Sequence, residues 1–229
     1  MWEPQITTLV EAGCRIILPD FPGFGETPLL DETSTMEEMA AGVVEILDRL
    51  KIEKAVIGGL SMGGYVTLNL YRLFPERFEA MILADTSSFA DTEEKREGRL
   101  KLISDIESGG MQAVIDAMLP NLVGETTKAD NPQLVKKLAE TFLQTDPQAA
   151  IAALRGMAAR QDHTEMLKEI SVPALLIFGA EDKVTNLDGA RKMEAEIPAA
   201  ELFIIEKAGH YSNQESPESF NRFLSRFVS

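Results

Sequence analysis

Short apolar runs alternate with amphipathic segments over the first part of the chain. Three of these runs are typical of strands buried on both faces of a parallel sheet: 15–18, 56–60 and 80–84. The neighbouring segments carry apolar residues at helical spacing: 4–12, 34–50 and 62–74. Ser34-x-x-Glu37 has the form of a capping box and predicts the start of the second helix. This alternation predicts an α/β fold with a mostly parallel, doubly wound sheet.

The alternation stops between residues 87 and 169, where helix patterns follow one another: 93–108, 111–119, 132–145 and 147–159. Asn131-Pro132 and Asp146-Pro147 each supply an N-cap followed by a proline in the first helical position. Strand patterns return at 174–178 and 202–205, with helices at 187–196 and from Pro217 onward. The chain is therefore expected to form a core from residues 1–86 and 170–229, with residues 87–169 as a helical cap.

The strand beginning at Val56 runs into Gly59-x-Ser61-x-Gly63, the pattern of a nucleophile elbow. A serine held on a sharp strand-to-helix turn needs glycines two residues away on each side, because the two backbones approach closely there. The Met62 N–H then points from the helix start toward an oxyanion formed on an attacked carbonyl. The alternative interpretation is a glycine-rich turn with an incidental serine.

A nucleophilic serine needs a base, and the base needs an orienting acid. His210 follows the last strand pattern and is the favoured base, whereas His163 is expected to be a solvated residue at a helix boundary. Asp182 follows the 174–178 strand and is the favoured acid. Asp85 follows the 80–84 strand, and its alternative interpretation is a cap of the next helix. Glu181 is expected to face solvent.

The net charge and the cysteine content limit which partners the chain can bind and which disulfide or zinc sites it can form. The 229 residues carry a net charge of −15, and the sequence pI is about 4.6. Such a chain repels nucleic acid and anionic membrane surfaces. A single cysteine, Cys14, allows no intramolecular disulfide and no cysteine cluster for zinc. We expect a cytoplasmic protein with a small-molecule substrate, without a membrane span or a nucleic-acid partner.

Four stretches in this order resemble the α/β-hydrolase superfamily: Asp20-x-Pro22-Gly23-x-Gly25-x-Thr27, Gly59-Leu60-Ser61-Met62-Gly63-Gly64, Gly179-x-Glu181-Asp182 and Gly209-His210. Within that family the chain is similar to small esterases and lactonases such as 3-oxoadipate enol-lactonase. The resemblance implies a cap in the insertion, no metal or other cofactor, and a covalent acyl-enzyme. It also implies that Ser61 attacks, His210 takes and returns the proton, and Asp182 holds the imidazole tautomer.

The start of the chain departs from the family pattern. Members normally begin with about three more strands and a His-Gly loop that supplies the second oxyanion N–H, so only the Met62 N–H has a source in these residues. The missing third strand belongs beside the Val56 strand. We therefore expect an N-terminally shortened sheet that is poorly stable, or is rescued by re-pairing or by association into a homo-oligomer.

The predicted function is that of a serine hydrolase cleaving a carboxylic ester or lactone through an acyl-enzyme on Ser61. A cofactor-free haloperoxidase or perhydrolase uses the same three residues and is the first alternative. A catalytically impaired, truncated relative is the second. Relatives with an aspartate nucleophile are disfavoured because position 61 is serine.

Overall fold

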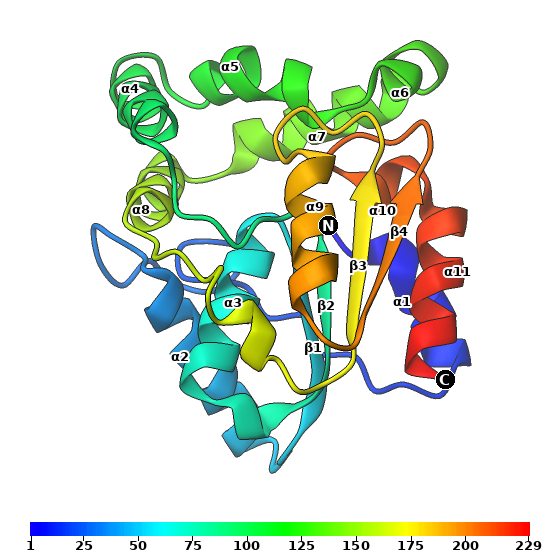
Figure 1. Cartoon of the computed structure of the whole chain (residues 1–229). Coiled ribbons are helices and arrows are strands. Elements are labelled where there is room, and N and C mark those ends of the chain that lie inside the picture. The colour runs from blue at the N-terminus through cyan, green and yellow to red at the C-terminus, as the bar shows by residue number, and fades with distance from the viewer.

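A computed structural model describes all 229 residues of the chain (Figure 1). Four parallel strands form one sheet in the order β1-β2-β3-β4: Ala55–Leu60, Phe78–Ala84, Ala174–Gly179 and Ala200–Ile205. Each strand pairs with the next along the chain, so β1 and β4 are the two edges of the sheet. The predicted parallel sheet is confirmed, with four strands in place of the five expected.

Helices cover both faces of this sheet (Figure 1). One face carries α2, α3 and α9: Met36–Arg49, Met62–Leu73 and Leu187–Glu196. The other face carries α1 and α11: Glu3–Glu11 and Pro217–Val228. A short helix α10, Ser212–Glu215, precedes α11, and two 3₁₀ turns connect other elements: η1, Pro75–Arg77, and η2, Leu167–Glu169.

The strand side chains alternate between two cores, as the period of a β-strand requires. Leu175 and Ile177 of β3 pack in the cluster that contains Phe220 of α11. Leu176 and Phe178 pack in the larger cluster on the opposite face, with side chains of α2, α3 and α9. All six residues of β3 are buried. The continuous apolar run at 174–178 is thus explained by coverage on both faces.

Five helices, α4 to α8, separate β2 from β3: Glu93–Gly109, Gln112–Leu122, Glu125–Asp130, Pro132–Gln144 and Pro147–Ala158. We call them the helical insertion. Helices α4 to α7 lie beyond the carboxyl ends of the strands, at the top of Figure 1, and α8 lies below α4 at the left. None of the helices is both long enough and apolar enough to cross a membrane.

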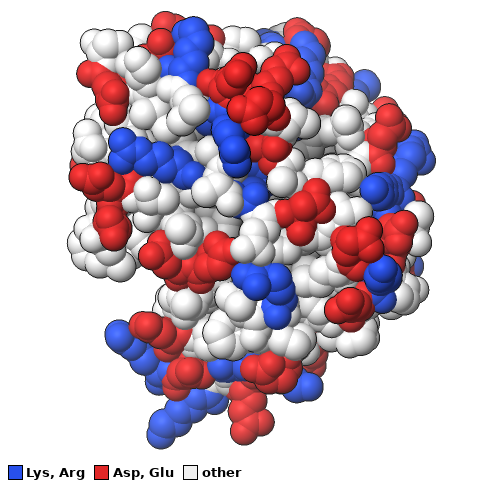
Figure 2. Space-filling view, turned by 60° about the vertical axis from the view of Figure 1, so that its left-hand side comes forward, with Lys and Arg blue, Asp and Glu red and all other residues white.

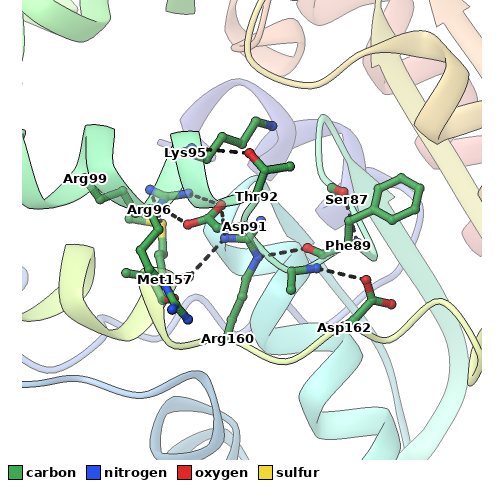
Figure 3. Close-up of polar contacts among 12 residues, drawn as sticks. Ser87, Phe89, Asp91, Thr92, Lys95, Arg96, Arg99, Met157, Arg160 and Asp162 are labelled. Atoms are coloured by element: carbon green, nitrogen blue, oxygen red, sulfur yellow. Dashed lines mark hydrogen bonds and ion pairs between the residues drawn. The ribbon is translucent and has the colours of Figure 1, made fainter.

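An ion cluster holds the insertion where it leaves and rejoins the core (Figure 3). Asp91, whose side chain is 1% exposed, accepts hydrogen bonds from Arg99 Nε and Arg160 Nη1, both at 2.5 Å. Burial raises the pKa of Asp91, but the hydrogen bonds and charges of the two arginines outweigh it and hold the pKa below its usual value. The Arg160 guanidinium also lies 4.2 Å from the centroid of the Tyr65 ring on α3. The insertion is therefore tied to the helix that follows Ser61.

His163 lies at this junction and is buried, with only 4% of its surface exposed. Its backbone N–H donates to the carbonyl of Ser88 at 2.8 Å, which brings the outgoing and returning segments together. Burial, and then the positive charge of Arg72, lower the pKa of His163. The expectation of a solvated residue was wrong, because the polar neighbours of His163 in sequence do not report the packing of the two segments.

The expected strand at 15–18 is absent, and the segment from Cys14 to Asp20 has no regular structure. Its residues pair with no strand, and Leu18 is 48% exposed. Ile16 and Leu18 instead line a cavity of about 30 Å³ with residues of α1. An apolar run becomes a strand only when a neighbouring strand satisfies its backbone groups, and β1 pairs only with β2.

Two helix boundaries also differ from expectation. The capping box of α2 is formed by Thr35 and Glu38, one residue after the expected pair Ser34 and Glu37. Ser34 is buried, and its N–H donates to the Ala152 carbonyl of the insertion, so it is held outside the helix. The helix expected at 111–119 extends through Pro120 to Leu122, and α6 had no counterpart in the predictions.

Acidic and basic side chains are interspersed over the face shown in Figure 2. The 37 acidic residues outnumber the 22 basic ones, and this face presents no continuous basic surface. A phosphate backbone requires such a surface for tight binding. The expectation that nucleic acid is not a partner stays a prediction.

Candidate active site

Ser61 lies on a strained turn between β1 and α3. Its φ of +53° and ψ of −114° are uncommon for a residue with a side chain. The turn is tight because the flanking glycines touch: a Cβ added to Gly59 would lie 2.1 Å from the carbonyl carbon of Gly63. The hydroxyl of Ser61 forms no capping hydrogen bond with the helix. The elbow geometry predicted for Ser61 is therefore present.

The end of β2 supports this turn from the side. The Ser61 N–H donates to the Ala84 carbonyl at 2.9 Å, and the Thr86 hydroxyl donates to the Ser61 carbonyl at 2.7 Å. Met62 is the first residue of α3, where backbone N–H groups have no acceptor within the helix. Its N–H is thus available to an anion at the helix start.

Asp182 and His210 come together from the loops after β3 and β4. His210 Nδ1 lies 2.8 Å from Asp182 Oδ2, and both side chains are almost completely buried. The other carboxylate oxygen, Oδ1, accepts from the N–H groups of Val184 at 2.7 Å and Thr185 at 3.1 Å. The Thr185 hydroxyl also donates to Oδ2. Asp182 is therefore held as an acceptor with its orientation fixed.

The two buried aspartates at this edge have opposite pKa shifts. Burial raises the pKa of Asp182, but the hydrogen bond and charge of His210 and the contacts of Thr185 and Val184 outweigh it and lower the pKa. Burial, and then the negative charge of Asp182, raise the pKa of Asp85 well above its ordinary value. Asp182 therefore loses its proton at lower pH than Asp85 does.

Asp85 is neither a helix cap nor a partner of the histidine. Thr92 caps α4, and Asp85 accepts from the Gly179 N–H at 2.8 Å and from the Ser212 hydroxyl. The alternative interpretation of Asp85 as a helix cap is wrong, because its carboxyl group turns toward Gly179 and Ser212. Asp85 thereby joins the ends of β2 and β3 to the segment after His210.

Glu181 was expected to face solvent. In the structure it is half-buried and hydrogen-bonded. Its carboxylate accepts from the N–H and hydroxyl of Thr126, in the helical insertion. The sequence around Glu181 gave no sign of this contact, since Thr126 lies 55 residues away. Glu215 is a second carboxylate near the site that sequence reasoning missed.

Thr185 was also missed, although a local signal for it exists. An aspartate often accepts hydrogen bonds from backbone N–H groups two and three residues ahead, and Asp182-x-x-Thr185 has the right spacing. No three His, Cys, Asp or Glu side chains are grouped as metal ligands would be.

The family model described as alpha/beta hydrolase fold matches residues 1–217 of the chain. The chain belongs to the α/β-hydrolase family. The expected family and fold class are confirmed, and so is the expectation of a hydrolytic enzyme of this family.

Curated and solved relatives of this α/β hydrolase cover nearly all of its length. It is 30% identical over 228 residues to 3-oxoadipate enol-lactonase 1 of Acinetobacter baylyi, which covers 100% of this chain and 83% of that protein. A thermophilic esterase from Thermogutta terrifontis is 32% identical with a TM-score of 0.95, over 99% of this chain and 84% of that one. The enol-lactonase from Burkholderia xenovorans LB400 is 26% identical with a TM-score of 0.88, over 99% of this chain and 85% of that one.

Proposed function

We propose that this α/β hydrolase is a serine hydrolase that cleaves a carboxylic ester or a lactone through an acyl-enzyme on Ser61. The observation that carries the proposal is the 2.8 Å contact between His210 Nδ1 and Asp182 Oδ2. A buried carboxylate on Nδ1 fixes the tautomer in which Nε2 is free to accept a proton. The similarity to an esterase and to enol-lactonases supports the choice of an ester or lactone bond.

In this mechanism the Ser61 oxygen attacks the carbonyl carbon while His210 Nε2 takes the hydroxyl proton. The carbonyl π electrons move onto oxygen, and the Met62 N–H donates to the resulting oxyanion. Collapse breaks the bond to the leaving alkoxide, which receives the proton from His210. Water then attacks the acyl-enzyme with the same base and releases the acid and Ser61.

We further propose that the helical insertion, within the predicted cap 87–169, covers Ser61 and limits the size of the substrate. Its position beyond the carboxyl ends of the strands supports this role (Figure 1), because ligands of open parallel sheets bind at that edge. The single, half-buried Cys14 makes a reducing compartment such as the cytoplasm the proposed location.

The proposal is tested by covalent labelling. The protein is treated with an organophosphorus ester, digested and analysed by mass spectrometry, and the adduct is expected on Ser61. Ser61→Ala should lose the adduct and lower kcat for a nitrophenyl ester by roughly 10⁶-fold. Ser212 is an internal control, because it is fully buried against Asp85. Labelling at another serine, or ester hydrolysis unchanged in Ser61→Ala, would overturn the proposal.

A further inference from the structure

Residues 122–126 of the helical insertion lie directly on the loop that carries His210. We call these residues the docking segment. The His210 N–H donates to the carbonyl of Leu122 at 3.1 Å. The two backbones also touch: a Cβ added to Gly209 would lie 2.3 Å from the nitrogen of Gly124. No side chain fits at this joint, so the docking segment and the His210 loop hold each other's backbone in place.

The carboxylate of Glu215 bridges the same joint. One oxygen, Oε2, accepts from the Gly124 N–H of the docking segment at 2.9 Å. The other, Oε1, accepts from the Tyr211 N–H, next to His210, at 3.0 Å. Hydrogen bonds from backbone N–H groups to a carboxylate are roughly twice as strong as those between neutral groups. A single side chain therefore links the insertion to the residue beside His210.

Glu181 makes an equivalent link on the loop that carries Asp182. Its carboxylate accepts from the Thr126 N–H at 2.8 Å and from the Thr126 hydroxyl at 2.5 Å. These hydrogen bonds lower the pKa of Glu181, so the group is a carboxylate at neutral pH. The Glu181 N–H also donates to the Ala208 carbonyl at 2.8 Å, which ties the Asp182 loop to the His210 loop.

Apolar packing completes the contact. Leu122 and Val123 of the docking segment are buried, and their cluster packs against Val184 and Tyr211. Val184 lies two residues after Asp182, and Tyr211 directly follows His210. The docking segment thus contacts an immediate neighbour of each of the two buried groups.

We propose that Glu215 is a positioning residue for His210, and that the docking segment must be seated on both loops for His210 to be aligned with Asp182 and Ser61. This inference rests on the proposed function, in which His210 is the base. It makes the helical insertion part of the scaffold of the catalytic residues as well as a wall of the substrate site. A displacement of the insertion would therefore misalign the base in the same motion.

Glu215→Gln tests the proposal by replacing one carboxylate oxygen with an NH₂ group. Glutamine keeps the size of the side chain and one acceptor oxygen, but its NH₂ group faces an N–H donor and leaves that donor unpaired. We expect kcat to fall about ten- to a hundredfold, because small displacements of a catalytic group cost up to about 10² in rate. KM should change less than about twofold, since Glu215 touches no substrate in this proposal. The rate of organophosphorus labelling of Ser61 should fall by the same factor as kcat.

Glu218→Gln is the matched control, because it makes the same change in charge three residues later on the exposed first turn of α11. It should leave kcat, KM and the labelling rate unchanged. A Glu215→Gln variant with unchanged kcat, or with raised KM and unchanged kcat, would overturn the positioning role. Absence of Ser61 labelling in the unmodified protein would instead overturn the proposed function, so the two failures are distinguishable.

Hydrogen exchange measures the coupling itself. In Glu215→Gln, amide exchange should accelerate in peptides covering both 118–127 and 207–214, and in Glu218→Gln it should accelerate in neither. Acceleration in only one of the two segments would contradict the coupling.

Thr126→Val removes the hydroxyl that donates to Glu181 and tests the coupling from the insertion side, should Glu215→Gln fail to fold. It is expected to lower kcat with little change in KM, and an unchanged kcat would overturn the proposal.

Discussion

The two halves of the candidate active site are built in different ways. Ser61 follows β1, an edge strand that pairs only with β2 and in which Val56 is 37% exposed. Asp182 follows β3, a fully buried strand with neighbours on both sides. The comparison shows that Ser61 is fixed by its own turn and by the end of the neighbouring strand, whereas the loops of Asp182 and His210 are also held by the helical insertion.

That difference predicts how strongly changes elsewhere in the chain affect each half of the site. The Ser61 turn is fixed by the contact of Gly59 with Gly63 and by two hydrogen bonds to the end of β2. An open edge at β1 leaves those interactions in place. The Asp182 and His210 half depends on the insertion, on Glu181 and on Glu215, which are far apart in the chain. Changes in remote segments should therefore affect the positions of Asp182 and His210 more than that of Ser61.

Among three variants that test this comparison, the largest effect is expected from Asp182→Asn, which changes only the half that contains Asp182 and His210. Asparagine fits the same space but presents an NH₂ group to His210 Nδ1 or favours the wrong tautomer, so kcat should fall by about 10⁴-fold. Thermal unfolding should show that the fold is retained. Asp188→Asn, an exposed change of the same charge on the first turn of α9, should leave kcat unchanged. Similar rates for the two variants would show that Asp182 does not orient the base.

Gly59→Ala breaks the nucleophile half and should have the next largest effect. The added methyl group would lie 2.1 Å from a backbone atom of Gly63, so the turn must open. We expect a loss of about 1–3 kcal/mol in the free energy of unfolding, together with reduced labelling of Ser61. Gly98→Ala in α4, where a methyl group meets nothing within 4 Å, should instead be neutral or stabilising. An unchanged unfolding free energy in Gly59→Ala would contradict the account of the turn.

The smallest effect is expected from Asp85→Asn. Only the pH dependence of stability should change in this variant, and kcat should not. The raised pKa of Asp85 means that the folded state holds a proton that the unfolded state releases above about pH 3.8, so stability is lost as pH rises toward the folded-state pKa. Asparagine mimics the protonated form and can satisfy Gly179 and Ser212 without that loss. The thermal midpoint of the variant should exceed that of the unmodified protein increasingly as pH rises.

The control for Asp85→Asn is Asp130→Asn, at an exposed position in α6, which should show no such growing difference. The kcat of Asp85→Asn at neutral pH should remain within about twofold of the original, because Asp85 does not contact His210. A difference in midpoint that stays constant with pH would show that Asp85 is already ionised in the folded state.

Much of the fold could be predicted because its signals are local. The runs at 80–84 and 174–178 are apolar without interruption, and strands covered on both faces require this. The elbow could be predicted because Gly59, Ser61 and Gly63 are adjacent in sequence. The pairing of Asp182 with His210 could be predicted because both follow strands whose carboxyl ends meet at one edge.

The remainder depends on partners that no local pattern describes. The run at 15–18 has the composition of a strand but lacks a neighbour to pair with, so it stays irregular. His163 has polar neighbours in sequence yet is buried by the junction of two segments. Glu181 and Glu215 look like ordinary surface acids until Thr126 and Gly124 are placed beside them. Long-range contacts of this kind require three-dimensional coordinates.

The packing of α1 on α11 has a consequence for folding during synthesis of the protein. Gln5 of α1 is buried and donates to the Asn213 carbonyl and to the Asn221 side chain, at 3.0 and 2.9 Å. The first pair is 208 residues apart, so at about 5–20 residues per second a ribosome completes it roughly 10–40 s after making Gln5. Trp2 and Leu9 of the same region pack against the cluster that contains Phe220, so their packing is also completed only when α11 has been made. Helix α1 is therefore made well before the C-terminal segments to which it is hydrogen-bonded.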